Sequence, residues 1–395
     1  MSKYGSPLVL TDGNIIRERC RMLKKNFPGI SFHYAVKANY NPYLVKIIID
    51  EGFGLDGVSP KEVLLGVKVG ISPEKIVYNE NNMTDKDMIE SVELGVNLTI
   101  GSISRLEKFC RKFPGKSIGI RINGDIAAAC HKTNLTAGPD SKFGIQFTEI
   151  ETALEMAKKY QVKITTAHQH IGSGWLDTTP FLEAMDILFR EVKKMPDVQK
   201  IDFGGGFGVP YKLDQNHLDY EKLSEQIFAK IASFEKEVGR KFEYAFEPGR
   251  FLVCESSVLL MTVNTRKTGS DGKIFIGTDS GFNHLVRPAM YGSYHEILNL
   301  SHPNEPAETV EICGNLCESA DFFAHDRLIP TISEGDILGI LNFGAYGLAQ
   351  SSPYNLRGMP AEVLIDGKIE KLIRRRETFE DLMHNFDYPF ALGTL

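Results

Sequence analysis

The sequence predicts an α/β protein: a TIM-like (β/α)₈ barrel followed by a smaller, β-rich domain. Short apolar runs alternate with amphipathic stretches about eight times over about 220 residues, which is typical of this barrel. After residue 250 the pattern changes to β-rich runs separated by turn residues, which indicates a second domain. An open, doubly wound sheet stays as the alternative, because the number of repeats does not exclude it.

The expected elements follow in chain order. A short strand over 7–10 and a helix over 14–27 come first. The barrel strands are expected at 31–37, 53–58, 76–79, 97–100, 117–122, 162–170, 199–203 and 242–247. Amphipathic helices are expected between them at 61–69, 85–94, 103–113, 149–160, 180–194 and 220–238. The β-rich runs are 251–264, 273–277, 309–313, 337–343 and 363–365, before a helix at 377–383. We therefore expect a barrel over 12–250 and a β-rich domain formed by 1–11 and 251–395.

Composition limits the class of protein. The chain has 395 residues, 42% of them hydrophobic and 24% charged, which is ordinary for a globular protein with two domains. A net charge of -6 argues against a nucleic-acid partner. No apolar run is long enough for a membrane span or a secretory signal. Six scattered cysteines suit reduced thiols in the cytoplasm, and Cys313 and Cys317 lack the neighbouring ligands of a metal site.

Lys37 is the most unusual residue of the first expected barrel strand. A lysine ammonium at the end of a buried strand is costly to desolvate, so it is usually paired or has a lowered pKa. A partly neutral amine can condense with an aldehyde to form a Schiff base. The alternative is that Lys37 extends from the strand end to water.

Polar residues and glycines gather where the barrel strands end, which is where such barrels carry their active sites. These residues are Lys37, Asp56, Asn81, Asn82, Arg121, Asn123, His168, His170, 204–206 and 247–250. Three successive glycines, with Gly205 and Gly206 among them, allow backbone N–H groups to approach an anion. Together with Gly249 and Arg250 they predict a phosphate site after the last two strands, although a tight packing turn explains the glycines equally well.

Three further side chains complete the prediction. Glu247 could hold a proton on a ring nitrogen or form an ion pair with Arg250. His170 could lie flat on a planar ring or be a core histidine, and Ser173 offers a hydroxyl to phosphate. A lysine that reacts with aldehydes, a phosphate cradle, a stacking histidine and a ring-nitrogen carboxylate together describe pyridoxal 5'-phosphate.

These residues resemble the fold-type III pyridoxal-phosphate decarboxylases over 34–383. The matching motifs are Tyr-Ala-Val-Lys-Ala-Asn at 34–39, His-Ile-Gly-Ser at 170–173, the glycines, Glu-Pro-Gly-Arg at 247–250, Cys-Glu-Ser-Ala-Asp at 317–321, 344–346 and 354–355. The resemblance implies an alanine-racemase-like barrel with a C-terminal β domain. The segments 287–291, 295–297 and 375–382 are most similar to the diaminopimelate decarboxylase branch.

The resemblance implies a role for each matching residue. Lys37 forms the Schiff base, His170 stacks on the ring and Glu247 pairs with the ring nitrogen. Phosphate and cofactor contacts are implied for Asp56, Ser173, Gly205, Gly206, Gly249, Arg250 and Tyr354. Substrate binding is implied for Arg250, Arg287, Tyr291, Glu318 and Tyr354. Cys317 protonates the substrate carbon after carbon dioxide leaves, and a homodimer is implied because Cys317 and Glu318 reach the cofactor of the partner subunit.

The substrate expected is meso-2,6-diaminopimelate, which would give L-lysine. Departures from that branch at Met83, Gly124, 130–138 (which includes His131) and Gly174-Trp175 keep a second hypothesis open. In it, the chain decarboxylates ornithine, lysine, arginine or a glutamyl-type conjugate. A pyridoxal-phosphate-binding regulator without catalysis, or a racemase on the same barrel, is the remaining alternative.

Overall fold

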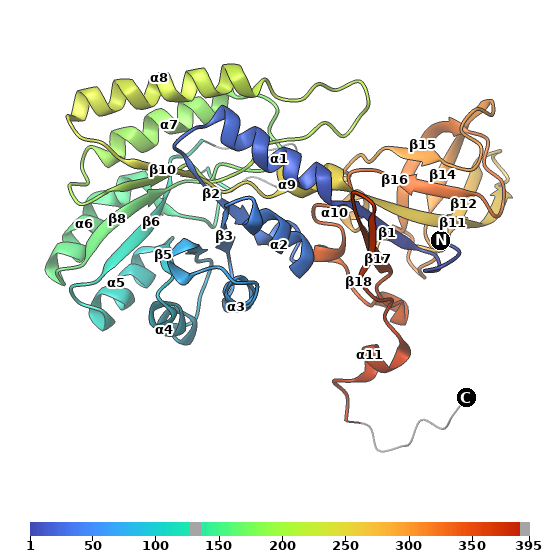
Figure 1. Ribbon diagram of the computed structural model, residues 1–395, viewed down its shortest axis with the longest axis horizontal. Coiled ribbons are helices and arrows are strands. Elements are labelled where there is room, and N and C mark those ends of the chain that lie inside the picture. The colour runs from blue at the N-terminus through green and yellow to red at the C-terminus, as the bar shows by residue number, and fades with distance from the viewer. Residues whose placement is uncertain (127–135, 139, 388–395) are drawn as a thin grey trace. The chain divides into compact units, whose positions relative to one another are not determined.

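The computed structural model describes residues 1–126, 136–138 and 140–387. The chain forms two compact units: Gly13–Ser256, and Met1–Asp12 together with Ser257–Leu395. Figure 1 shows the elements of both units.

The first unit contains a closed barrel of eight parallel strands. In spatial order the strands are β5 (Asn97–Ile100), β4 (Ile76–Asn79), β3 (Gly54–Gly57), β2 (Ser31–Ala35), β10 (Glu243–Phe246), β9 (Lys200–Asp202), β8 (Lys163–His168) and β6 (Ser117–Asn123). Pairing of Thr99 with Gly119 joins β5 to β6 and closes the ring, and β7 (Ile145–Gln146) adds to the end of β6. The predicted barrel is confirmed, and the open sheet is excluded because the ring has no free edge.

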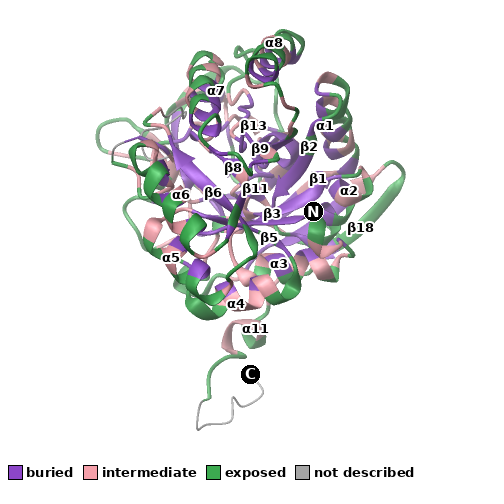
Figure 2. Ribbon diagram, turned by 90° about the vertical axis from the view of Figure 1, so that its left-hand side faces the viewer, coloured by how far each residue is buried: buried purple, intermediate pink, exposed green. Residues whose placement is uncertain are grey.

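Helices surround this barrel. They are α1 (Gly13–Asn26), α2 (Pro42–Asp50), α3 (Pro60–Lys68), α4 (Asp85–Leu94), α5 (Ile103–Lys112), α6 (Ile150–Lys159), α7 (Thr179–Val192) and α8 (Tyr220–Val238). In α5, Leu106, Phe109 and Cys110 recur at helical spacing and are buried, and the Ser102 side chain caps the first turn. Figure 2 shows the result: buried strands at the centre and helices whose outer faces are exposed.

Two predicted elements are wrong in part. The strand predicted over 31–37 ends at Ala35, and Val36–Ala38 form a 3₁₀ turn. The backbone N–H of Ala35 donates to the carbonyl of Pro248 at 3.1 Å, so the chain leaves the ladder there. The run 251–264 begins as α9 (Arg250–Val253) and a further 3₁₀ turn (Cys254–Ser256), and only then becomes strand β11. The buried apolar residues of α9 resemble those of a strand, so hydrophobicity alone did not separate the two.

The second unit is mostly sheet. Its strands pair in the order β15 (Phe322–Pro330), β14 (Ala307–Cys313), β12 (Ile274–Thr278), β11 (Ser257–Thr268), β1 (Leu8–Asp12), β17 (Ala361–Asp366) and β18 (Ile369–Arg374). Strand β16 (Ile337–Ile340) pairs with β11 and with β13 (Ile297–Asn299). Short helices α10 (Arg287–Tyr291) and α11 (Phe379–Met383) complete the unit. Its core contains Leu259, Met261, Ile312 and Phe343.

The N-terminal strand β1 belongs to this second unit, because it pairs with β11 and β17. Among the helices that the structure describes, none has the length and apolar character needed to cross a bilayer.

Candidate active site

Lys37 and Asp56 lie together where β2 and β3 end. The Lys37 Nζ is 3.5 Å from the Asp56 Oδ2, and the Lys37 side chain is 37% exposed whereas that of Asp56 is 0% exposed. Burial, and after it the nearby Glu247, raise the pKa of Asp56 to about 6. The lysine therefore sits between solvent and a buried acidic interior, with its amine next to a carboxylate.

Glu247 follows β10 and is buried with two partners. Its Oε1 accepts from the Asn79 side-chain amide at 2.5 Å, and its Oε2 lies 2.9 Å from the His168 Nε2. Burial raises the pKa of Glu247, and the positive charge of Lys37 opposes the shift. Its contacts in the barrel interior are thus different from the ion pair with Arg250 considered above.

Asn79 is a site residue that the sequence analysis missed. Its amide also donates to the Asp56 Oδ1 at 2.8 Å, so one side chain links both buried carboxylates. The available signal was its position, because it ends the strand predicted over 76–79 where the neighbouring strands also end in polar residues.

Ser173 and Arg250 form a second group in the same unit. The Arg250 Nη2 donates to the Ser173 Oγ at 3.0 Å, and its Nη1 donates to the Tyr211 hydroxyl at 2.5 Å. Tyr211 lies outside every motif quoted above, and only the fold brings it here. A guanidinium and two hydroxyl groups form a suitable set for an anion such as phosphate.

The glycines after β9 allow close packing. A Cβ on Gly205 would lie 2.1 Å from the carbonyl oxygen of Glu247, and one on Gly206 would lie 2.3 Å from the Trp175 Nε1. The Gly205 N–H donates to the His170 Nδ1 at 3.1 Å, which orients that imidazole. Burial holds the pKa of His170 well below its usual value, so the ring is neutral. The glycines thus let the β9 loop approach Glu247 and His170 closely. Gly249 is similarly constrained, since its Cβ would meet that of Ala35 at 3.0 Å.

His168, Asp202 and Arg121 complete the interior of the barrel. One side-chain atom each of His168, Asp202 and Glu247 lies within 4.8 Å of the others. The Arg121 guanidinium donates to the carbonyls of Thr136 and His170 and lies 4.7 Å from the Phe143 ring centre. Burial lowers the pKa of Arg121 to about 10.

In the second unit, Cys317 lies on an exposed loop held through its backbone. The Cys317 N–H donates to the Asn355 Oδ1 at 2.9 Å. Asp321 is buried and accepts from the N–H groups of Leu316 at 2.8 Å and Phe282 at 2.6 Å. The loop is therefore fixed on both sides of the cysteine, while the thiol side chain stays exposed.

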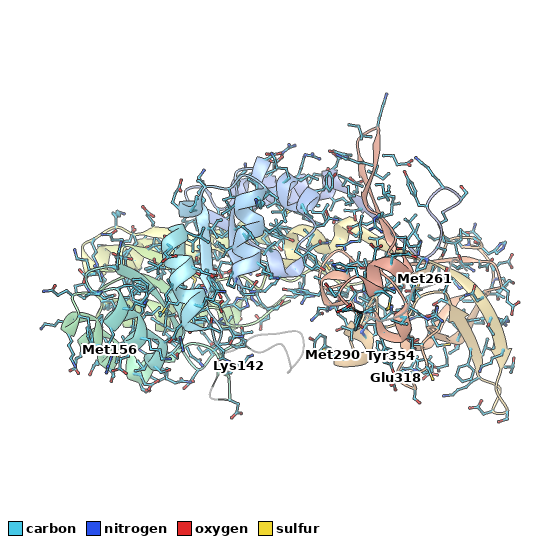
Figure 3. All side chains as sticks on the ribbon, turned by 90° about the horizontal axis from the view of Figure 1, so that it is seen from below. Lys142, Met156, Met261, Met290, Glu318 and Tyr354 are labelled. Atoms are coloured by element: carbon cyan, nitrogen blue, oxygen red, sulfur yellow. The ribbon has the colours of Figure 1, made fainter. Side chains whose placement is uncertain are left out.

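Tyr354 and Glu318 belong to the same region of the second unit. The Tyr354 ring stacks on Phe282 with centroids 5.8 Å apart, and Figure 3 labels Tyr354 and Glu318 at one edge of this unit. The hydrogen bond between Cys317 and Asn355 brings their two loops together.

Arg287 and Tyr291 begin and end α10. Arg287 is buried, with its Nη1 2.8 Å from the His295 Nε2, and the Tyr291 hydroxyl accepts from Gln350 at 3.3 Å. The predicted site residues thus form one set in the barrel and one in the β-rich unit.

The departures from the branch pattern have partly structural explanations. Trp175 is buried and stacks on Phe181 with centroids 5.1 Å apart, so it fills the core. Met83 is also buried. The segment 127–135, with Cys130 and His131, lies outside the described residues.

Comparison with known proteins agrees with this geometry. Residues 14–254 match the family model of the pyridoxal-dependent decarboxylase, pyridoxal binding domain. A diaminopimelate decarboxylase of Methanothermobacter thermautotrophicus is 39% identical over 99% of this chain and 94% of its own length. A crystal structure of diaminopimelate decarboxylase matches with a TM-score of 0.91 at 32% identity, covering 97% of this chain and 94% of that one. The Helicobacter pylori enzyme complexed with L-lysine matches with a TM-score of 0.89 at 29% identity, covering 97% of each chain. The chain therefore belongs to the pyridoxal-dependent decarboxylases, in the diaminopimelate decarboxylase family, and its cofactor is pyridoxal 5'-phosphate.

Proposed function

We propose that the chain decarboxylates meso-2,6-diaminopimelate to L-lysine and carbon dioxide. The observation that carries the proposal is the half-exposed Lys37 beside the buried carboxylates of Asp56 and Glu247. The relatives supply the substrate, since they are named diaminopimelate decarboxylases and one was solved with L-lysine.

The residues of the barrel fit pyridoxal phosphate. The Asp56 Oδ2 is buried without a hydrogen bond among the described residues, and the Lys37 ammonium 3.5 Å away is the cation beside it. Glu247 is the second buried carboxylate of the group, and a protonated pyridine nitrogen is a cation that such a carboxylate can stabilise. Lys37 offers an amine to an aldehyde, and the group of Ser173, Arg250 and Tyr211 suits a phosphate.

The bound cofactor would withdraw electrons from the bond between Cα and its carboxylate, so that carbon dioxide can leave. Lys37 would hold the cofactor through its aldehyde carbon, and Glu247 would keep a proton on the ring nitrogen. His170 would lie against the ring, since Gly205 holds its imidazole. Contacts to the cofactor are proposed for Asp56, Ser173, Gly205, Gly206, Gly249, Arg250 and Tyr354.

The β-rich unit would supply the rest of the chemistry. Cys317 would donate the proton to Cα after carbon dioxide leaves, as a general acid. Charged and hydroxyl groups suit a substrate with two amino and two carboxylate groups. The proposed substrate contacts are Arg250, Arg287, Tyr291, Glu318 and Tyr354.

The first experiment measures carbon dioxide and amino-acid products from purified holoenzyme. We expect release of carbon dioxide and L-lysine from meso-2,6-diaminopimelate. Ornithine, lysine, arginine and glutamyl conjugates run in parallel. Release from one of these alone would identify the second hypothesis, and cofactor absorbance without any turnover would indicate a binding protein.

We also propose a homodimer in which each site takes Cys317 and Glu318 from the partner, in the cytoplasm. Exposure of both side chains in the single chain supports this, because they are then available to a site on a partner subunit. The test mixes Lys37→Ala subunits with Cys317→Ala subunits and lets them exchange at random. About half the dimers then contain one subunit of each kind, and each of these holds one intact site of its two. We therefore expect about a quarter of wild-type activity. Recovery near zero, with dimers present by sedimentation, would contradict shared sites.

A further inference from the structure

A row of buried polar groups continues from Glu247 toward the N-terminal end of the barrel. His168 and Asp202 are register partners on the adjacent strands β8 and β9. Both side chains are 1% exposed. The Asp202 Oδ1 accepts from the Gly204 N–H at 3.0 Å, and one side-chain atom each of His168, Asp202 and Glu247 lies within 4.8 Å of the others. Thus Asp202 is next to His168, and His168 is next to Glu247.

The two nitrogens of His168 have different surroundings. Its Nε2 lies 2.9 Å from the Glu247 Oε2, while its Nδ1 is buried and has no hydrogen-bond partner within the described part of the chain. Burial lowers the pKa of His168 to about 4, so the imidazole is neutral near pH 7. A neutral imidazole carries one proton, and only the tautomer protonated at Nε2 can donate to Glu247. The Nδ1 of that tautomer is then a buried acceptor.

Asp202 is the group that can supply a donor to this acceptor. Burial and the neighbouring Glu247 raise the pKa of Asp202 to about 7, so much of it is a carboxylic acid at neutral pH. The charged groups that act on this pair, from every strand packed against it, are Lys37, Asp56, Arg121, Lys200 and Glu247. Because His168 and Asp202 are register partners with side-chain atoms within 4.8 Å of each other, the protonated oxygen of Asp202 is a candidate donor to the His168 Nδ1.

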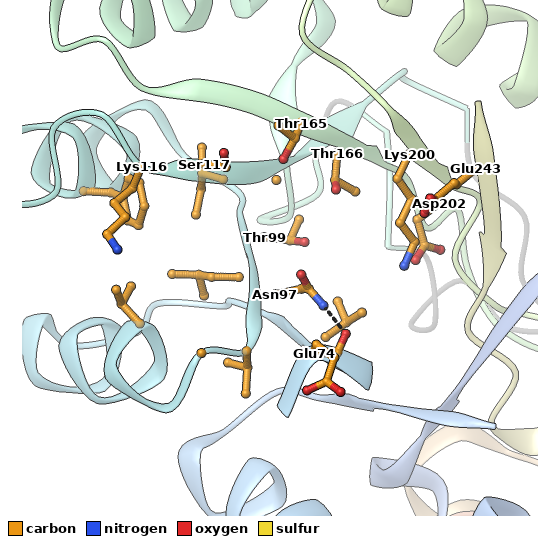
Figure 4. Close-up of a pocket in the computed structure, with 18 residues that line it drawn as sticks. Glu74, Asn97, Thr99, Lys116, Ser117, Thr165, Thr166, Lys200, Asp202 and Glu243 are labelled. Atoms are coloured by element: carbon orange, nitrogen blue, oxygen red, sulfur yellow. Dashed lines mark hydrogen bonds between the residues drawn. The ribbon is translucent and has the colours of Figure 1, made fainter. Parts of the chain in front are cut away.

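Asp202 also borders a polar cavity. It lines a cavity of about 360 Å³ at the N-terminal ends of the strands, together with Thr99, Thr166 and Lys200 (Figure 4). Exposed residues at the rim, Glu74 and Lys116, line the same cavity. Such a polar cavity is large enough for several water molecules. The cavity therefore borders the buried Asp202 from the N-terminal ends of the strands.

We propose that His168 and protonated Asp202 are positioning residues for Glu247. Asp202 holds His168 in the tautomer that carries its proton on Nε2. This N–H donates to one oxygen of Glu247 and so stabilises the Glu247 carboxylate in its anionic state. The proposal rests on the proposed role of Glu247 at the cofactor ring. Loss of this donor makes the Glu247 carboxylate harder to ionise, so Glu247 competes with the ring nitrogen for the proton between them. The electron demand of the cofactor then falls, which lowers kcat and leaves substrate binding unchanged.

The test compares His168→Leu, His168→Gln and Asp202→Asn with Thr166→Val, a cavity-lining control on the same strand. We expect His168→Leu to lower kcat about tenfold or more, with KM within about twofold. His168→Gln, which restores an N–H donor, should recover most of kcat. The pH dependence of the absorbance of the bound cofactor should differ from wild type in His168→Leu. In Thr166→Val it should be the same as in wild type.

Asp202→Asn separates positioning from mere packing, because the amide keeps a donor but cannot lose its proton. We expect it to retain kcat near neutral pH and to lose the decline that wild type shows above about pH 7, in both kcat and cofactor absorbance. A wild-type profile flat to about pH 9, or a decline unchanged in Asp202→Asn, overturns the proposal. So does a His168→Gln variant as impaired as His168→Leu. If wild type turns over no amino acid, the proposed function fails, and the absorbance titrations still decide this inference.

Discussion

The barrel interior and the cysteine loop position their reactive groups in different ways. In the barrel, side chain contacts side chain: Asn79 joins Asp56 to Glu247, and His168 takes the remaining oxygen of Glu247. In the β-rich unit, Asp321 and Asn355 hold backbone N–H groups around Cys317, and the thiol and the Glu318 carboxylate stay exposed.

This difference separates two kinds of control. Burial sets the protonation of the barrel groups, because desolvation is the first cause of the raised pKa values of Asp56, Asp202 and Glu247. The cysteine loop instead controls where a group is placed. Substitutions in the barrel should therefore change the cofactor spectrum and pH dependence, whereas those in the loop should change kcat alone.

The largest effect is expected from Glu247→Gln. The amide cannot hold a proton on a ring nitrogen, and its NH₂ group faces a donor from Asn79 or His168. We expect kcat to fall on the order of 10²- to 10³-fold, with a changed cofactor absorbance. Steady-state kinetics at matched cofactor content check it. A kcat within about threefold of wild type would remove Glu247 from the proposed mechanism.

A smaller effect is expected from Asp321→Asn. The amide loses one of the two acceptors that hold the N–H groups of Phe282 and Leu316, so the loop carrying Cys317 is held less firmly. We expect kcat to fall about tenfold, as for a modest misplacement of a reacting group, with the cofactor spectrum unchanged. Asp326→Asn, at an exposed position of the same unit, is the matched control. A spectral change in Asp321→Asn would show that the two regions are not separable in this way.

Asp56→Asn is expected to have the smallest effect on catalytic geometry. In cofactor-free protein it should still have a clear effect on stability. The pKa of Asp56 is raised in the folded state from 3.8 to about 6, so its contribution to stability is present below about pH 4 and is lost as pH rises through about 6. At about pH 8 the substitution should stabilise the fold by about 1–3 kcal/mol, since each pKa unit corresponds to about 1.4 kcal/mol.

Thermal unfolding at about pH 4 and about pH 8 measures this effect of Asp56→Asn. The Tm gain should be present at the higher pH and small at the lower one. An equal gain at both would show that packing, and not charge burial, is responsible.

The sequence alone determined the fold class and supplied most of the candidate residues on the barrel side of the site. Strand and helix periodicity repeats about eight times, and side-chain patterns of this kind are local properties of the chain. Lys37, Asp56, His170 and Glu247 could be predicted as site residues because parallel strands in a barrel all end at one face, so a position along the sequence already implies a position in space.

Only the tertiary structure decided which partners these groups have. Asn79 to Glu247 and Tyr211 to Arg250 are contacts between distant segments, and the pairing of β8 with β9 places Asp202 beside His168. Likewise, Ala35 ends its strand because Pro248 supplies its hydrogen bond, and Gly205 is small because the Glu247 carbonyl lies against it. Such contacts arise from the closing of the barrel, which no local pattern of residues encodes.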